Sequence, residues 1–249
     1  MGFKDHFSAQ AAQYGLHRPR YPPELAGYLA ALAPSRALAL DVATGNGQAA
    51  LELALHFERV LASDASAAQL AQAMAHPRVQ YLRHPAERLP VAGGTADLVA
   101  VAQAAHWLDL PRFYAEARRA LRPGGILALW TYSNLRVEPG CDAVLDRFYR
   151  DRVGAYWPAE RRHVEAGYRT LPFPLTELHA PAFELSGDWS LERVVAYVGT
   201  WSAVARCRAA EGADPLPALA GELSVPWAGA PVRPVRWTLH LRLGRFVPI

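Results

Sequence analysis

Residues 37–48 read ALALDVATGNGQ. An apolar run ends in the acid Asp41, passes through a turn that contains Gly45 and Gly47, and enters a helix-like segment at 49–56. This order is typical of a buried parallel strand, a tight turn and the start of a helix. Glycine suits the turn because a side chain would resist positive φ and would keep the backbone away from a ligand. The stretch therefore predicts an α/β fold with a ligand at this turn.

A second acid follows about one strand later. Residues 60–64 end in Asp64, which is placed to bind the hydroxyls of a ribose, so we expect a nucleoside-type ligand. Two cofactor classes fit. From Gly45 to Ala50 the turn is G-x-G-x-x-A, as in dinucleotide-binding folds. From Asp41 it is D-x-A-x-G-x-G, which resembles the glycine-rich signature of class I methyltransferases that use S-adenosyl-L-methionine (SAM).

The charge of Asp41 favours SAM over NAD. A carboxylate at this place can bind the amino part of the methionine moiety, directly or through water, whereas it would repel a pyrophosphate. An NAD-dependent enzyme is the less favoured alternative. Residues after 133 turn to aromatic and proline-rich patterns and show no second nucleotide-binding half.

Three further segments follow in the order expected of such a fold. A third strand at 79–82 precedes the loop 83–90, and a fourth strand from 96 runs into a loop that ends at Trp107. Residues 121–130 then combine a helix end, a turn and a fifth strand. Gly124 is expected at the helix C′ position, where a left-handed conformation favours glycine.

With these motifs in this order, the chain resembles the type 11 group of class I SAM-dependent methyltransferases. Residues 7–22 and several aromatic motifs of the C-terminal half also resemble its trans-aconitate methyltransferase-like subgroup. The resemblance implies a Rossmann-like, doubly wound, mostly parallel seven-stranded sheet with an antiparallel last strand. It implies a single methyltransferase domain with an N-terminal helical lid (1–33), a SAM-binding core (34–133), and a helical or irregular substrate-side insertion with the final strands (134–249).

The resemblance also implies which residues hold SAM. They belong to the N-terminal segment, the glycine-rich turn and the loops that follow the next three strands: Tyr14, Arg18, Asp41, Ala43, Gly45, Gly47, Gln48, Asp64, Ala65, Ala86, Glu87 and Gln103. Arg18 could close over the cofactor and bind a carboxylate, or it could pair with a surface acid. Gln103 could bind the methionine end of SAM or satisfy backbone groups at the strand end.

One residue departs from the glycine-rich signature. Ala43 stands where the signature has its first glycine. Because alanine adds only a methyl group, SAM binding should survive if Ala43 keeps a negative φ.

Catalysis by this class requires alignment more than acid–base chemistry. Methyl transfer from a sulfonium is an in-line displacement, and a general base is needed only when the acceptor arrives protonated. A carboxylate acceptor, which the subgroup resemblance implies, needs none. His106 is the candidate catalytic base because it follows the fourth strand, but with Trp107 it could simply line the pocket, or it could hydrogen-bond to a backbone carbonyl.

The C-terminal half supplies candidates for an acceptor pocket. Trp107, from the fourth-strand loop, is joined there by three aromatic residues: Tyr156, Trp157 and Trp201. Arg161, Arg162 and His163 could bind an anionic substrate, but a solvated helix face is the preferred explanation.

The same half predicts regular elements around an irregular stretch. Helices are expected at 141–153, 190–208 and 215–224, with an irregular part at 156–181 and strands at 183–189 and 235–246. The alternation of apolar and polar residues in the last segment fits an antiparallel edge or near-edge strand.

Length, composition and charge limit which other functions fit this chain. The chain has 249 residues and a formal net charge of +3, which suits one enzyme-sized domain and does not indicate nucleic-acid binding. No apolar run reaches the roughly 20 residues of a membrane span, and the N-terminus lacks a signal core. Cys141 and Cys207 lack metal-ligand spacing, so no metal is expected. We expect a cytoplasmic monomer or weak homodimer acting on a small molecule; the alternative is a non-catalytic SAM-binding or partner-binding protein.

Overall fold

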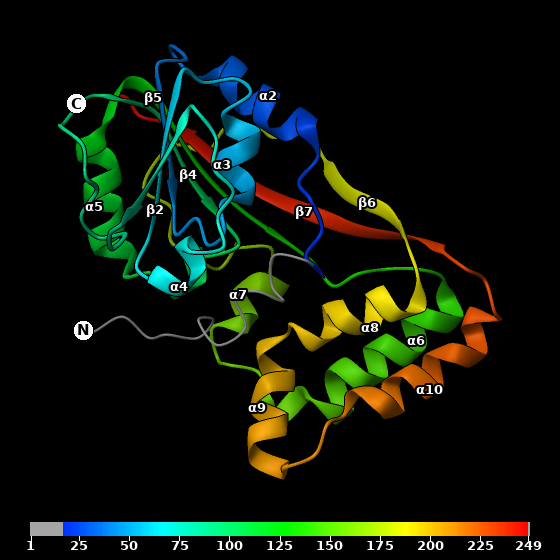
Figure 1. The fold of residues 1–249 in the computed structure, drawn as a ribbon. Coiled ribbons are helices and arrows are strands. Elements are labelled where there is room, and N and C mark those ends of the chain that lie inside the picture. The colour runs from blue at the N-terminus through cyan, green and yellow to red at the C-terminus, as the bar shows by residue number, and fades with distance from the viewer. Residues whose placement is uncertain (1–16, 249) are drawn as a thin grey trace.

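The computed structural model describes residues 17–248. Its seven-stranded sheet has the order β3-β2-β1-β4-β5-β7-β6 (Figure 1). The strands are β1 (Leu38–Val42), β2 (Arg59–Asp64), β3 (Val79–Arg83), β4 (Ala96–Ala102), β5 (Leu121–Tyr132), β6 (Phe183–Trp189) and β7 (Arg233–Arg245). β7 runs antiparallel to both of its neighbours, β5 and β6, and it lies one strand in from the edge. The Rossmann-like sheet with an antiparallel last strand is confirmed.

The strand order reverses between β1 and β4. β1 pairs in parallel with β2 on one side and with β4 on the other. The connections therefore leave toward opposite faces of the sheet, and in open α/β sheets ligands bind beyond the carboxyl ends of the strands at such a reversal. The predicted glycine-rich turn and the predicted loop after β4 both lie at this reversal.

Both faces of the sheet are buried, which explains why most residues of the central strands are apolar. Ala39 packs into the core on one face, while Leu38 and Leu40 pack into the core on the other. Helices α2 (Pro23–Leu32) and α3 (Gln48–Leu53) contribute to the first core, and α5 (Leu110–Ala120) contributes to the second. A short helix, α4 (Ala67–Leu70), follows β2. Strands covered on both faces need apolar residues at successive positions.

A buried acid joins the amino ends of the central strands. Asp97, at 0% exposure, accepts hydrogen bonds from Ser35 Oγ and from the Leu38 N–H, both at 2.8 Å. Its carboxylate also lies 3.2 Å from Nε of Arg122. These contacts connect β1, β4 and β5 at the edge opposite the predicted site.

The prediction for Gly124 is half wrong. Gly124 has φ +80°, as a left-handed residue should, but α5 already ends at Ala120 with Leu121 in an extended conformation. The chain leaves the helix directly into β5, where Leu121 pairs with Ala96. Gly124 therefore lies inside β5, at the irregularity before the regular pairing with β4 resumes at Ile126.

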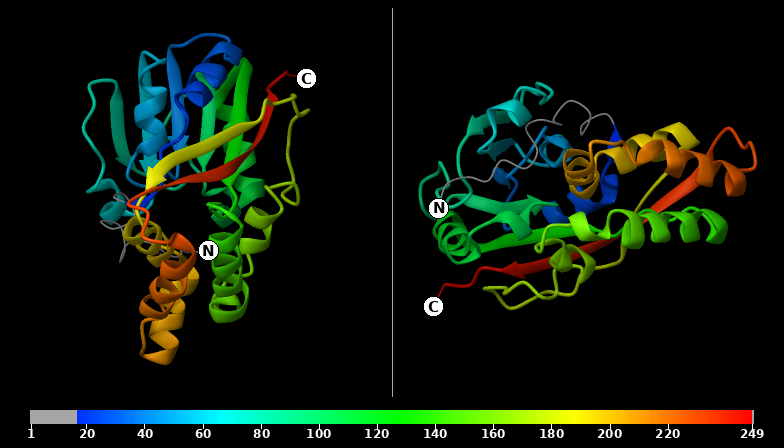
Figure 2. Two further views of the ribbon diagram at one scale, coloured as in Figure 1. Left: turned by 90° about the vertical axis from the view of Figure 1, so that its right-hand side faces the viewer. Right: turned by 90° about the horizontal axis from the view of Figure 1, so that it is seen from below.

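The C-terminal half adds a group of helices below the sheet (Figures 1 and 2). They are α6 (Pro139–Arg147), the π-helical turn η3 (Phe148–Arg152), the 3-10 turn η4 (Gly154–Tyr156), α7 (Arg161–Glu165), α8 (Leu191–Gly199), α9 (Ser202–Glu211) and α10 (Leu216–Trp227). The predicted helix at 141–153 thus ends in a π turn, in which the Val153 N–H bonds to the Phe148 carbonyl at 3.1 Å. Within residues 17–248, none of the helices has the length and apolar composition needed to cross a membrane.

Candidate functional site

The turn after β1 is built from left-handed residues. Ala43, Gly45 and Gly47 have φ values of +56°, +59° and +86°. The condition of a negative φ at Ala43, under which the alanine was expected to leave SAM binding intact, is therefore not met. The chain must reverse sharply between the end of β1 and the start of α3 at Gln48, and this turn uses the left-handed region even where a Cβ is present.

Gly47 has no room for a side chain. A Cβ atom there would lie 2.3 Å from the hydroxyl oxygen of Tyr81, on β3. The Tyr81 hydroxyl in turn donates to the Met74 carbonyl at 3.1 Å. The glycine is thus required both for its backbone angle and for the approach of Tyr81.

Asp64 links the turn to the end of β2. One carboxylate oxygen accepts the Gly45 N–H at 2.9 Å, and the other accepts the Ser66 N–H at 2.8 Å. Each carboxylate oxygen has two lone pairs, so the group can still accept hydrogen bonds from a ligand. Ala65 follows directly, and its carbonyl accepts from Nε of Arg83 at 3.2 Å.

Asp41 is a fully buried carboxyl group at the end of β1. Its Oδ2 accepts a 2.5 Å hydrogen bond from Thr44 Oγ1, whereas its Oδ1 forms no hydrogen bond with any described residue. Burial raises the pKa of Asp41 to about 7, although the Thr44 hydroxyl and the Ala50 N–H act in the opposite direction and lower it. The site therefore has a buried acid that gains most from a cationic partner.

The loop after β3 lies beside the end of β2. The His84 N–H bonds to the Asp64 carbonyl at 2.9 Å, which places the predicted pair Ala86 and Glu87 just beyond the end of β2. Ala86 is buried, and Oε1 of Glu87 accepts the Asp109 N–H at 3.2 Å. Tyr14 lies outside the described residues.

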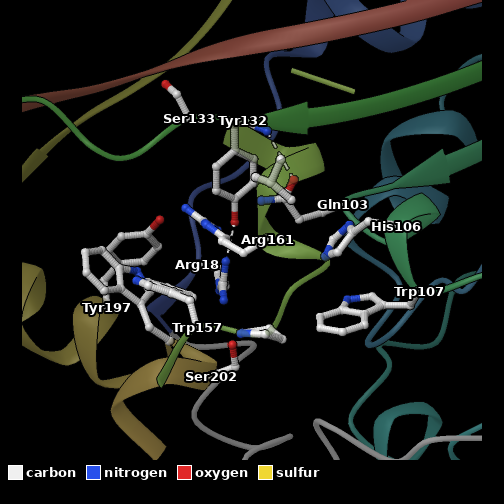
Figure 3. Close-up of a pocket in the computed structure, with 13 residues that line it drawn as sticks. Arg18, Gln103, His106, Trp107, Tyr132, Ser133, Trp157, Arg161, Tyr197 and Ser202 are labelled. Carbon is white, nitrogen blue, oxygen red and sulfur yellow. Dashed lines mark hydrogen bonds between the residues drawn. The ribbon is translucent and has the colours of Figure 1, made fainter. Parts of the chain in front are cut away.

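A pocket opens at the carboxyl ends of β4 and β5 (Figure 3). Residues from the N-terminal segment, both strand ends and the C-terminal helices line it: Arg18, Gln103, His106, Trp107, Tyr132, Ser133, Trp157, Pro158, Arg161, Val164, Tyr197, Trp201 and Ser202. None of these described lining residues is acidic. The pocket thus joins two arginines with aromatic walls.

The two arginines are held by different parts of the chain. Arg18 donates to the Tyr132 hydroxyl at 2.8 Å, and its guanidinium lies 5.5 Å from the ring centre of Tyr197. It therefore contacts pocket residues from β5 and α8. In Figure 3 it lies between the rings of Trp157 and Tyr197 on one side and that of Trp107 on the other.

Arg161 is held by hydrogen bonds to two residues that do not line the pocket. Its Nε donates to the Tyr149 hydroxyl at 2.8 Å and its Nη2 to Asn134 Oδ1 at 2.6 Å. Its guanidinium carbon lies 4.5 Å from the ring centre of Trp157. Nη1 has no acceptor among the described residues. Of the basic group considered from sequence, Arg161 lines the pocket, whereas Arg162 is exposed and does not.

His106 lies in the short helix η2 (Ala105–Trp107) and lines the pocket. Its Nδ1 is 2.8 Å from the hydroxyl oxygen of Tyr168. Burial, together with the nearby charges of Arg161 and His163, lowers the pKa of His106 to about 3. The imidazole is therefore neutral at neutral pH and is a weak base.

Gln103 serves the strand end, one of its two predicted roles. Its Oε1 accepts from Thr131 Oγ1 and from the Tyr132 N–H, the latter at 3.1 Å. The residue has φ +58°, and its own N–H bonds to the Trp130 carbonyl at 2.8 Å. Gln103 thus joins β4 to β5 while it lines the pocket.

Of the four aromatic residues proposed from sequence for an acceptor pocket, the structure places three in the lining of this cavity and one outside it. Trp107, Trp157 and Trp201 line the cavity. Tyr156 does not, because its hydroxyl donates to Glu211 on α9 at 2.8 Å. Tyr156 is the last residue of η4 and Trp157 follows it, and the two side chains point in different directions. Tyr156 therefore lies outside the pocket although Trp157, its neighbour in sequence, lines it.

Several lining residues were not predicted from the sequence, among them Tyr132 and Ser133. Tyr132 ends β5 and Ser133 follows it, and the rule that ligands bind beyond the carboxyl ends of parallel strands could have identified both. Among the described residues, no group of three or more His, Cys, Asp or Glu side chains is placed to hold a metal ion.

The fold, the glycine turn and the buried acid define a SAM-dependent methyltransferase, and relatives agree. Residues 40–129 match the family described as Methyltransferase domain. A Dictyostelium discoideum protein named as a methyltransferase is 32% identical over 219 residues, which cover 86% of this chain and 83% of that protein. The chain therefore belongs to the methyltransferase family, and its cofactor is SAM.

Two other relatives are similar over different lengths. A solved structure from Anaeromyxobacter dehalogenans, named for a type II methyltransferase, is 48% identical, with a TM-score of 0.87 over 93% of this chain and 99% of that chain. An uncharacterized methyltransferase from Mycobacterium tuberculosis is 36% identical over 124 residues, about half of each protein. No acceptor is given in these names.

The described residues fit SAM. Oδ1 of Asp41 is a buried acceptor that suits the ammonium of the methionine moiety, and Gly45 and Gly47 present backbone without Cβ atoms. Asp64 and the loop that contains Ala86 suit the ribose and the base. The cofactor supplies a methyl group already activated by a sulfonium.

Proposed function

We propose that this methyltransferase transfers the methyl group of SAM to a carboxylate oxygen of a small molecule. The observation that carries the proposal is the charge of the pocket, which contains Arg18 and Arg161 and, among its described lining residues, no acid. Guanidinium groups bind carboxylates through paired hydrogen bonds. The resemblance to trans-aconitate methyltransferase-like proteins is in keeping with such an acceptor.

The chemistry agrees with the side chains present. A carboxylate is deprotonated at neutral pH, so its oxygen needs no base before it attacks the methyl carbon. The carbon–sulfur bond breaks as the carbon–oxygen bond forms, and the products are a neutral methyl ester and S-adenosylhomocysteine. The protein must hold the acceptor, align it and exclude water, which the arginines and the aromatic walls can do.

The proposed roles follow from position. Asp41, Gly45, Gly47, Asp64 and the loop that contains Ala86 and Glu87 hold SAM, while Arg18 and Arg161 hold the acceptor carboxylate. Trp107, Trp157 and Trp201 enclose the apolar part of the acceptor. We further propose that the enzyme acts in the cytoplasm as a monomer or weak homodimer.

The test is a transfer assay with methyl-labelled SAM against matched acceptors. Small carboxylic acids should become labelled, and alkali should release the label as methanol because the product is an ester. Phenols, alcohols and amines of the same skeleton should remain unlabelled. An alkali-stable product from one of those acceptors would overturn the proposal. Binding of S-adenosylhomocysteine by calorimetry without transfer to any acceptor would favour the non-catalytic alternative.

Matched arginine variants test whether the two pocket arginines bind the acceptor. Arg161→Gln and Arg18→Gln should each lower kcat/KM for the acid by about 10- to 100-fold, the effect of losing a charged hydrogen bond. Arg162→Gln removes the adjacent exposed arginine and should change kcat/KM little. Equal losses in all three variants would indicate a general charge effect and contradict binding by the pocket arginines.

A further inference from the structure

Tyr168 is a fully buried residue that reaches the pocket through His106. Its side chain is 0% exposed, and its hydroxyl oxygen lies 2.8 Å from Nδ1 of His106. The two ring centres are 5.7 Å apart. Tyr168 itself does not line the pocket, so any effect on a bound molecule passes through the imidazole.

The backbone at Tyr168 adopts an unusual conformation. Gly167 has φ +58° and Tyr168 has φ +62°, so two successive residues are left-handed. A Cβ at Gly167 would lie 2.7 Å from Cγ of His240, so that position admits only glycine. A left-handed tyrosine is unfavourable by itself and persists only where the surrounding structure holds it.

Arg242, on β7, supplies that support. Its Nη1 donates to the carbonyls of Tyr168 and Leu171, at 2.8 and 2.6 Å. Its Nε donates to Oε2 of Glu177 at 3.1 Å, which fixes the guanidinium from the other side. The sheet therefore holds the turn that presents the Tyr168 hydroxyl to His106.

This contact decides which nitrogen of His106 can meet an acceptor molecule. With Nδ1 engaged by Tyr168, only Nε2 is available to a molecule in the pocket. A neutral imidazole carries one proton, so a hydroxyl that donates to Nδ1 leaves the proton on Nε2. A donor at Nε2 suits a pocket whose two arginines also present only donors.

We propose that Tyr168 is a positioning residue whose hydroxyl donates to Nδ1 of His106, and that His106 uses Nε2–H to hold an oxygen of the acceptor instead of removing a proton. The acceptor part of this inference rests on the proposed function, whereas the proton position on His106 does not. The low pKa of His106 agrees with a neutral ring that serves as a donor.

Nitrogen-15 NMR of histidine-labelled protein tests the proton position without any acceptor. Nine histidines are present, and His106→Gln assigns the relevant signals. In the wild type, Nε2 of His106 should show a protonated, pyrrole-like shift and Nδ1 a pyridine-like shift, unchanged from about pH 5 to about pH 8. A pyridine-like Nε2 would overturn the proposal, whatever the acceptor proves to be.

Tyr168→Phe tests the positioning role. It should change the tautomer signals of His106 and lower kcat/KM by about three- to tenfold, the effect of losing one hydrogen bond, while the affinity for S-adenosylhomocysteine stays the same. Tyr114→Phe is the matched control, because that hydroxyl bonds to the Pro172 carbonyl at 2.7 Å and does not contact His106. Unchanged His106 signals in Tyr168→Phe, or an equal change in Tyr114→Phe, would contradict the role. If Tyr168→Phe does not fold, the wild-type spectrum alone decides.

Discussion

The Thr44 hydroxyl donates a 2.5 Å hydrogen bond to Oδ2 of Asp41, and Oδ1 of the same buried carboxyl has no hydrogen bond among the described residues. One side of this acid is thus satisfied by the glycine-rich turn, and the other side is left for a ligand. A buried carboxyl arranged in this way costs stability when it ionises and recovers that cost when it binds a cation.

Asp41→Asn should alter how stability depends on pH. The pKa of Asp41 is about 7 in the folded chain, against 3.8 for an unperturbed carboxyl. A raised folded-state pKa contributes stability that is present below about pH 4 and is lost as the pH rises toward 7. The variant lacks this loss, so near pH 8 it should be more stable than the wild type by up to about 4 kcal/mol.

Urea unfolding at several pH values measures this effect. The same variant should bind SAM more weakly, since it cannot offer a charge to the ammonium. Thr44→Val provides a comparison, because it removes a hydrogen bond that lowers the pKa of Asp41, so the loss of stability should continue to higher pH than in the wild type. Parallel stability curves for Asp41→Asn and the wild type would show that Asp41 does not titrate in this range.

Ala43→Gly should relieve strain in the turn. Ala43 has φ +56°, a conformation that disfavours a Cβ by about 1–2 kcal/mol, and glycine recovers part of this despite its larger unfolded-state entropy. We expect a small gain in the free energy of unfolding and tighter binding of S-adenosylhomocysteine, measured by calorimetry. Ala228→Gly, at φ +50° after α10, should give a similar gain without any change in binding. Weaker binding in Ala43→Gly would mean that the methyl group of Ala43 contacts the cofactor.

Gly47→Ala should damage the turn in two ways. First, a side chain is strained at the φ of +86° that residue 47 adopts. Second, the new Cβ would lie 2.3 Å from the hydroxyl oxygen of Tyr81 and would clash with it. Gly94→Ala isolates the first effect, because Gly94 has φ +68° with no atom within 4 Å of a Cβ. We expect about 1–2 kcal/mol of destabilisation in Gly94→Ala and more in Gly47→Ala, by urea unfolding.

The double variant Gly47→Ala/Tyr81→Leu checks the clash itself. It should be less destabilised than the sum of the two single variants, because the leucine no longer meets the new methyl group. Additive losses would indicate that Tyr81 moves aside without cost, and that only the backbone angle matters at Gly47.

Trp157 and Tyr156 should behave differently although they are adjacent. Trp157→Leu removes a wall of the pocket and the ring beneath Arg161, so kcat/KM for the acceptor should fall, while cofactor affinity stays the same. Tyr156→Phe removes only the hydrogen bond to Glu211 and should leave steady-state kinetics unchanged. Equal losses in both variants would place Tyr156 in the acceptor site after all.

The sequence predicted those parts of the fold that depend on interactions between residues close together in the chain. The strand that ends at Asp41, the turn with Gly45 and Gly47, and the strand that ends at Asp64 follow from apolar runs and backbone rules that act within a few residues. Ala43 shows where such rules fail. The sequence did not decide the backbone angle of Ala43, which the geometry of the whole connection sets in the left-handed region.

The acceptor side of the site was less predictable. Arg161 and Arg162 are equivalent in sequence, yet only Arg161 is held by Tyr149, Asn134 and Trp157 and lines the pocket. A helix of five residues presents its side chains in several directions, and the packing of α7 selects which of them faces inward.

The sequence by itself determined the order of strands and helices, the glycine-rich turn and the two acids, because strand burial, turn geometry and charge act over short distances along the chain. Only the tertiary structure decided that Arg18 meets Tyr132, that Tyr168 fixes His106, and that Tyr156 turns away. The first two contacts join residues that are distant in sequence, and the direction of Tyr156 depends on how its segment packs. Local periodicity in the sequence encodes neither long-range contacts nor packing directions.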